Sequence, residues 1–143
     1  MTLIRIETNA VDIVWPHVKD LLQLSVDRNL GEFTIEDVEE WLRGGQMDLW
    51  VIGNKEDGIM LAAATEFVDY PRERRLRVVL GSSKKNTMDS WLKYCWHEDS
   101  ELIRFARANN AERFEILARD GWTKTLAKEG FKKYCTVLTR EVN

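Results

Sequence analysis

Apolar and polar residues follow two regular periods in the first part of the chain. Residues 3–7 alternate between the two kinds of side chain, which predicts a half-buried β-strand. From Val11 onward the apolar positions recur every three or four residues, which predicts a helix that buries one face. Pro16 falls near the start of this helix, where a missing amide hydrogen is tolerated.

A second helix and a set of strands follow. Thr34 and Asp37 have the spacing of a capping box, and Gly44-Gly45 is the expected end of the helix. Three apolar runs bounded by turn residues predict an antiparallel meander, at residues 48–54, 58–68 and 74–81. The third strand is expected to place alternate apolar residues on one face, namely Leu76, Val78 and Leu80.

Helical spacing returns after a loop at residues 82–87, where Asn86 or Thr87 is the expected N-cap. The spacing continues to Asn109, which predicts one long helix with a kink in its polar middle, residues 97–101. The remaining elements are a strand, a helix closed by Gly130 and a last strand, at residues 113–119, 123–129 and 131–142.

The element order β-α-α-β-β-β-α-β-α-β predicts an α+β protein with a mixed sheet and helices packed on its faces. A length of 143 residues with 44% hydrophobic residues suits a single domain over residues 1–143. No run approaches the roughly 18 apolar residues of a membrane span, and the N-terminus lacks the pattern of a signal peptide. We therefore expect a soluble, cytoplasmic protein that does not bind membranes.

The cysteines and histidines argue against a metal site. Cys95 and Cys135 are not in a CxxC spacing, and His17 and His97 are separated from them in sequence. We therefore expect no metal, and we expect both cysteines to be buried small residues without a disulfide.

Charge is distributed unevenly. Residues 1–60 carry 12 acidic and 5 basic side chains, a balance of −7, whereas residues 61–143 carry 12 and 16, a balance of +4. The basic residues cluster at Arg72, Arg74, Arg75 and Arg77 and again at Lys84 and Lys85. A phosphate-bearing ligand would be attracted here, although a solvated hairpin and loop explain the same pattern. The total of −3 makes nucleic-acid binding the third choice among functions.

This element order, with the closing segment TLAKEGFKKYCTVL at residues 125–138, resembles the GNAT (Gcn5-related N-acetyltransferase) superfamily. The likeness covers nearly the whole chain and is closest to small GNAT-like proteins of bacteriophages. The features that carry it are Trp15-Pro16, Leu49-Trp50-Val51, Asp69-Tyr70-Pro71 and the series Gly121, Trp122, Leu126, Gly130 and Phe131.

The resemblance implies that acetyl-CoA, as co-substrate, lies in an opening where the fourth and fifth strands diverge after Leu76. Its pantetheine arm would pair with the backbone of Val78, Val79 and Leu80. Its pyrophosphate would meet the loop that begins with Gly81, Ser82 and Ser83 at the start of a helix. Side chains expected to add charge or a wall to this site are Lys84, Lys85, Arg119 and Trp122. The family's habit and an exposed strand edge also favour a homodimer.

The chain departs from the family pattern at two places. GNAT enzymes usually carry Q/R-x-x-G-x-G/A at the phosphate loop, and here only Gly81 remains. Many members place a proton-donating Tyr four residues before the Gly of the Gly-Phe pair, and here that residue is Leu126. Tyr134, water or another donor takes that role, or the chemistry is slow or absent. Glu66 or Asp69 is the candidate general base, with simple surface exposure as the alternative for each.

The leading hypothesis is an N-acyltransferase that moves an acetyl group from acetyl-CoA to an amine of a small molecule or a protein, by direct attack and with Glu66 and Tyr134 as base and acid. The alternative is a GNAT-shaped phage protein that has lost catalysis and binds or inhibits a host protein, or forms part of the virion. Its basis is the two departures from the family pattern.

Overall fold

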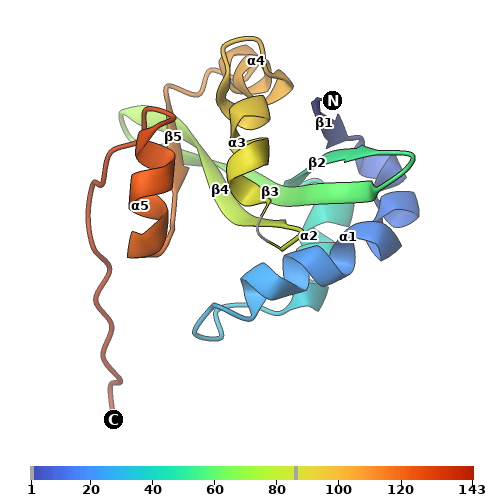
Figure 1. Cartoon of the computed structure of the whole chain (residues 1–143). Coiled ribbons are helices and arrows are strands. Elements are labelled where there is room, and N and C mark those ends of the chain that lie inside the picture. The colour runs from blue at the N-terminus through green and yellow to red at the C-terminus, as the bar shows by residue number, and fades with distance from the viewer. Residues whose placement is uncertain (1, 86) are drawn as a thin grey trace.

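The structure is a computed structural model that describes residues 2–85 and 87–143, without the side chains of residues 88–91. A twisted sheet forms the centre of the molecule (Figure 1). Helices α1 (Val11–Val26) and α2 (Ile35–Gly44) cover one face. Helices α3 (Met88–Trp96) and α4 (Glu101–Ala108) cover the other, and α5 (Asp120–Ala127) stands beside α3. This confirms the predicted α+β class.

The described residues form one five-stranded sheet in the order β1-β2-β3-β4-β5. Its strands are β1 (Leu3–Ile6), β2 (Asp48–Asn54), β3 (Gly58–Tyr70), β4 (Glu73–Ser83) and β5 (Arg113–Ile116). The first four are antiparallel neighbours, which confirms the predicted meander, and β5 pairs with β4 in parallel. A 3₁₀ turn at Thr8–Ala10 connects β1 to α1.

Local chemistry explains the boundaries of α2. The Thr34 hydroxyl accepts the Asp37 amide at 3.3 Å, and the Asp37 carboxylate accepts the Thr34 amide at 2.8 Å, so the predicted capping box is present. Gly45 ends the helix with φ at 79°, in the left-handed region that favours glycine.

The predicted long helix is wrong, because the chain breaks between α3 and α4. The Ser100 hydroxyl donates to the Cys95 carbonyl at 2.7 Å and accepts the Ile103 amide at 3.1 Å, so it ends one helix and caps the next. The polar stretch that predicted a kink therefore makes two helices. At the start of α3 the N-cap is Thr87, whose side chain makes no capping bond, and Asn86 lies outside the described residues.

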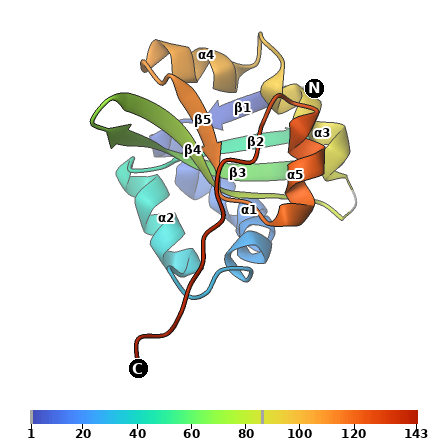
Figure 2. The same cartoon turned by 90° about the vertical axis from the view of Figure 1, so that its left-hand side faces the viewer.

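The predicted last strand is also wrong. Residues 131–143 adopt no regular secondary structure, and they pass β5 without joining the sheet (Figure 2). Phe131 packs on Trp96 with ring centroids 4.8 Å apart, but Tyr134, Val137 and Leu138 are exposed. β5 itself has only four residues and ends at Ile116, so it offers this segment few backbone partners.

The described core divides into two clusters, one on each face of the sheet. Leu22, Val38 and Leu80 belong to the cluster under α1 and α2, whereas Trp50 and Leu76 belong to the cluster under α3 and α4. Leu76 and Leu80 therefore lie on opposite faces, and the prediction that they share one is wrong. The reason is an irregularity in β4, described below.

The two cysteines differ in environment. Cys95 is buried, as predicted, whereas Cys135 is exposed, contrary to the prediction, because it lies on the segment that does not join the sheet. Burial raises the pKa of the Cys95 thiol to about 12. None of the described helices is long and apolar enough to span a bilayer.

Candidate functional site

Strands β4 and β5 run together and then separate. They pair in register from Arg75 opposite Arg113 to Val78 opposite Ile116. Beyond Val78, β4 continues to Ser83 and keeps its pairing with β3, while the chain after Ile116 turns toward α5. In the described part of the chain, residues 79–83 of β4 thus have no strand partner on the β5 side. The separation was predicted after Leu76 and begins two residues later.

A β-bulge at Val79 marks the point of separation. Ala64 of β3 pairs with Leu80 and the next residue, Thr65, pairs with Val78, so Val79 is an extra residue in β4. Such a bulge bends its strand and increases the local twist. It also reverses the faces of the residues before it, which places Leu76 and Leu80 on opposite sides of the sheet. The run Val-Val-Leu contains no glycine, so the sequence carried no signal for it.

Helix α1 borders the unpaired part of β4. The Ser25 hydroxyl accepts the Gly81 amide at 3.4 Å, a long bond that connects helix and strand. α1 runs antiparallel to β4 (Figure 1), so the residues that follow Ser25 lead back toward the bulge. Arg28 follows the last residue of α1 by two positions.

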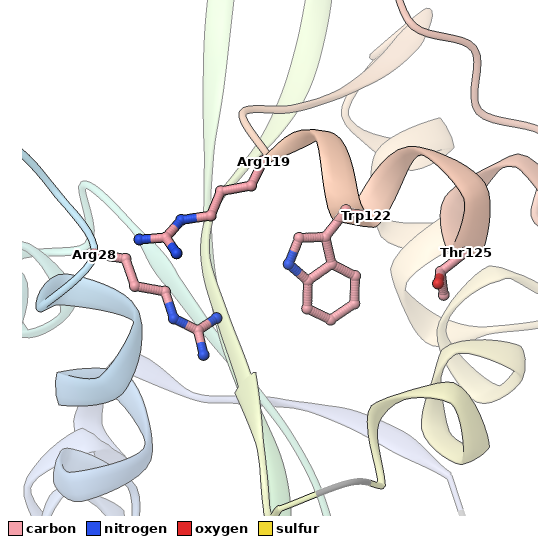
Figure 3. Close-up of a pocket in the computed structure, with 5 residues that line it drawn as sticks. Arg28, Arg119, Trp122 and Thr125 are labelled. Atoms are coloured by element: carbon pink, nitrogen blue, oxygen red, sulfur yellow. The ribbon is translucent and has the colours of Figure 1, made fainter.

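An open hollow of about 460 Å³ lies between the end of α1 and the start of α5. Its lining residues are Arg28, Arg119, Gly121, Trp122 and Thr125. Figure 3 shows the guanidinium groups of Arg28 and Arg119 in the same space in front of β4, with the Trp122 ring beside them. Arg119 and Trp122 were predicted at the site, whereas Arg28 was missed because no pattern distinguishes it from a surface arginine.

The hollow has a positive electrostatic character. Within the residues described, neither Arg28 nor Arg119 makes a side-chain hydrogen bond or an ion pair. The acidic neighbour of each is engaged elsewhere: Asp27 accepts from Gln23 at 2.7 Å, and Asp120 pairs with Lys133 at 3.2 Å. The N-terminus of α5 adds the positive end of a helix dipole.

The loop after β4 holds the other predicted cofactor residues. The Lys84 ammonium donates a hydrogen bond to the Asp57 backbone carbonyl at 2.8 Å, in the turn between β2 and β3. The ammonium group is therefore already engaged within the protein. The Ser83 hydroxyl donates to the Lys84 carbonyl at 3.3 Å. Ser82 is buried and Lys85 is exposed. The structure thus brings Arg119 and Trp122 together in the hollow and leaves Lys84 outside it.

A charged cluster occupies the paired end of β4 and β5. Glu115 accepts hydrogen bonds from Tyr70 at 2.9 Å, Arg75 at 2.9 Å and Arg77 at 2.6 Å. Burial favours the neutral form of the Glu115 carboxyl, but these hydrogen bonds outweigh it and lower its pKa below the ordinary value. The hydrogen bonds that the Arg75 guanidinium donates to Glu73 and Glu115 raise the pKa of Arg75. We call these residues, with Glu66, the Glu115 cluster.

The candidate base and acid both lie at this cluster. The Glu66 carboxylate is 3.5 Å from a terminal nitrogen of Arg77. The guanidinium carbon of Arg75 lies over the Tyr134 ring, 5.8 Å from the ring's centroid. Tyr134 is 84% exposed. Asp69 forms an ion pair with Arg74 at 3.5 Å. Leu126 is buried in α5, so it contributes to packing and offers no proton.

Comparison with known proteins supports the fold strongly. No protein-family model matches the chain, and no curated protein matches its sequence. Solved structures do match over almost the whole length. An acetyltransferase of Trypanosoma brucei has a TM-score of 0.67 at 12% identity, with 98% of each chain covered.

Two further structures extend this likeness. A predicted acetyltransferase of Clostridium acetobutylicum, crystallised with acetyl-CoA, has a TM-score of 0.63 at 14% identity and covers 99% of this chain and 96% of its own. Glucosamine-6-phosphate N-acetyltransferase of Arabidopsis thaliana has a TM-score of 0.63 at 10% identity, covering 99% and 98%. The chain therefore has the fold of GNAT acetyltransferases.

Proposed function

We propose that the protein is an N-acyltransferase that moves an acetyl group from acetyl-CoA to the amine of a small molecule. One observation carries the proposal: β4 parts from β5 at a bulge and continues for five residues without a strand partner on that side. An extended, amide-containing arm is the kind of ligand that such a strand edge binds. The fold supports the reaction class, since similar structures include N-acetyltransferases.

The donor would lie along this edge. Val78 already pairs with Ile116 of β5, so the arm pairs with the backbone of Val79 and Leu80, and backbone amides near the bulge polarise the thioester carbonyl. Its pyrophosphate meets the segment from Gly81 to Lys85 at the start of α3, where amides and the helix dipole favour an anion. Trp122 and Arg119 border the donor from α5. Lys85 is exposed and would add charge, whereas Lys84 must first leave the Asp57 carbonyl.

The reaction needs a base for the amine and a proton for the departing thiolate. The amine nitrogen attacks the thioester carbon, the carbon–sulfur bond breaks, and the amine's proton leaves through a base. Glu66 is the proposed base, and Tyr134 is the proposed acid in place of Leu126. Both lie beside the arginines at the head of the opening, and alignment of donor and amine supplies much of the rate.

Calorimetric titration with acetyl-CoA tests the proposal, with Gly81→Asp as the informative variant. An added Cβ at Gly81 meets no described atom within 4 Å, so this variant should fold, yet its carboxylate faces the donor's phosphates. We expect binding to weaken by about tenfold or more, because like charges repel at short range. Lys55→Asp, in the exposed turn after β2, is the matched control and should bind normally. Absence of heat and of a thermal shift at millimolar acetyl-CoA would reject the proposal.

A second proposal is that the fold persists without catalysis and binds a host protein or serves in a virion. The buried Leu126 and the bound ammonium of Lys84 support it. A defined partner retained at one-to-one stoichiometry in the absence of acetyl-CoA would favour this alternative, and acetylation of an amine would exclude it. A single domain, a bacteriophage source, a cytoplasmic location and a homodimer are further proposals that rest on the sequence and its resemblance.

A further inference from the structure

Arg28 and Arg119 share one space, although 90 residues separate them in sequence. Six other arginines form ion pairs with carboxylates, namely Arg5, Arg43, Arg74, Arg75, Arg77 and Arg113. The two in the hollow have no such partner within the described chain. Two like charges that face one space repel each other, and an anion between them removes that repulsion. The hollow is therefore suited to an anionic group.

The position of this pair separates it from the donor's phosphates. Arg119 follows Ile116 by three residues, and Ile116 lies opposite Val78. Arg28 follows Ser25, which contacts Gly81, by three residues, and it lines the same hollow as Arg119. The segment proposed to meet the donor's pyrophosphate runs from Gly81 to Lys85, which at about 3.3 Å per residue lies roughly 7–20 Å beyond Val79 along the chain. The arginines thus flank the point where the donor would present its uncharged thioester.

We infer that the hollow is the acceptor site, and that it takes a small amine carrying a carboxylate or phosphate group. This inference rests on the proposed function. The two guanidinium groups hold the anion by charge-assisted hydrogen bonds, and the Trp122 ring packs on the apolar or planar part of the acceptor. A volume of about 460 Å³ admits a small molecule. The same charges disfavour a polycationic amine.

The role assigned to the pair is orientation. With its anion fixed, the acceptor's uncharged amine nitrogen attacks the carbonyl carbon of the thioester at the bulge. A carbon–nitrogen bond forms, the carbon–sulfur bond breaks, and the proton lost by nitrogen is balanced by one gained at sulfur. The products are an N-acetyl amide and free coenzyme A thiol.

The test is a set of matched acceptors assayed with saturating acetyl-CoA, with release of the coenzyme A thiol as the signal. Phosphoethanolamine is compared with ethanolamine, and phenylalanine with phenylalaninamide. We expect each anionic member to have a kcat/KM roughly tenfold to hundredfold higher, as lost charge-assisted hydrogen bonds imply. Arg28→Gln and Arg119→Gln should each remove most of this preference, and in Arg28→Gln the Kd for acetyl-CoA measured by calorimetry should stay within about twofold of wild type.

Arg104→Gln is the control, because Arg104 is an exposed arginine on α4 that forms no ion pair in the described chain. It should keep the full preference. If Arg28→Gln weakens acetyl-CoA binding and acetyl transfer equally, then Arg28 binds the phosphates of the donor and not an anion of the acceptor. That result would overturn the inference, while the proposed function would stand. Normal donor binding with no preference for anionic acceptors would also overturn it. Absence of acetyl-CoA binding in the wild type would end both.

A second readout applies if no member of the set is acetylated. Inorganic phosphate and benzoate are titrated into the protein while the indole N–H resonances are followed by NMR, with Trp122→Phe to assign the signal. A saturable shift of the Trp122 resonance that Arg28→Gln abolishes supports the inference. No shift, or an equal shift in Arg28→Gln and in Arg104→Gln, contradicts it.

Discussion

Two pairs of arginines lie along β4, and they differ in what neutralises them. At the paired end, Arg75 and Arg77 donate to Glu115 of the neighbouring strand. At the open end, Arg28 and Arg119 line the hollow, and neither forms an ion pair with a carboxylate of the described chain. Where the two strands are joined, charge is used to hold them together. Where they part, Arg28 and Arg119 have no carboxylate partner in the described chain, and this difference is why we propose a ligand there.

The bulge at Val79 divides the two regions. On the Glu115 side, the residues of β4 alternate so that Arg75 and Arg77 face away from the core under α3 and α4, and Leu76 faces into it. Beyond Val79 the strand bends, its pairing with β5 has ended, and Leu80 faces the core under α1. A single extra residue therefore sets both the opening and the faces of the charged side chains.

Deletion of Val79 is expected to have the largest effect. Without the extra residue, one part of β4 must turn over, which buries Arg75 and Arg77 or expels Leu76 or Leu80 from the core. We expect a loss of about 4 kcal/mol or more, enough to unfold a domain of ordinary stability. Thermal melting followed by circular dichroism measures it.

Deletion of Leu30 is the matched control, since this exposed residue lies in the connection between α1 and α2. It should cost about 1 kcal/mol or less. A Val79 deletion that melts at the wild-type temperature would show that the bulge does not orient the charged side chains.

Glu115→Gln should have an intermediate effect. It removes the negative charge that accepts hydrogen bonds from three donors at a partly buried position. After allowance for solvent screening, we expect the free energy of unfolding to fall by roughly 1–2 kcal/mol. Urea unfolding measures it, with Glu112→Gln, an exposed glutamate without an ion pair in the described chain, as the control. Arg28→Gln, at the open end, should stay within about 0.5 kcal/mol.

The effect of Glu115→Gln should depend on pH in one direction. The pKa of Glu115 is lower in the folded protein than the ordinary 4.5, so its ionised form stabilises the fold. That contribution is fully present above pH 4.5 and is lost as the pH falls through the folded-state value. The gap between wild type and variant should therefore narrow below pH 4.5, and a gap that widens there would contradict the assignment.

Tyr134→Phe should have the smallest effect on stability, within about 0.5 kcal/mol, because the side chain is exposed on a segment outside the sheet. If its phenol protonates the thiolate, acetyl transfer should fall by about a hundredfold with an unchanged Kd for acetyl-CoA. Stopped-flow detection of the released thiol measures the rate. A rate within about threefold of wild type would assign that proton to water.

Much of the fold was predictable because its signals are local. The alternation in β1, the periodic face of α1 and the capping box of α2 each depend on neighbours within a few residues. The break at residues 97–100 was predicted only as a kink, because the polar stretch did not show that Ser100 would bond to Cys95 and cap α4. Arg119 and Trp122, which line the hollow, were predicted as site residues through the resemblance of the closing segment, whereas Arg28 carried no signal.

The remaining failures involve partners distant along the chain. Residues 131–142 have strong strand propensity, but a strand needs a hydrogen-bonding neighbour, and the four-residue β5 does not provide one. Periods of two and 3.6 residues sufficed for the α+β class and for most element boundaries, since short-range hydrogen bonds and burial of one face act locally. The bulge, the separation of β4 from β5 and the meeting of Arg28 with Arg119 depended on how distant segments pack, which no single stretch of sequence encodes.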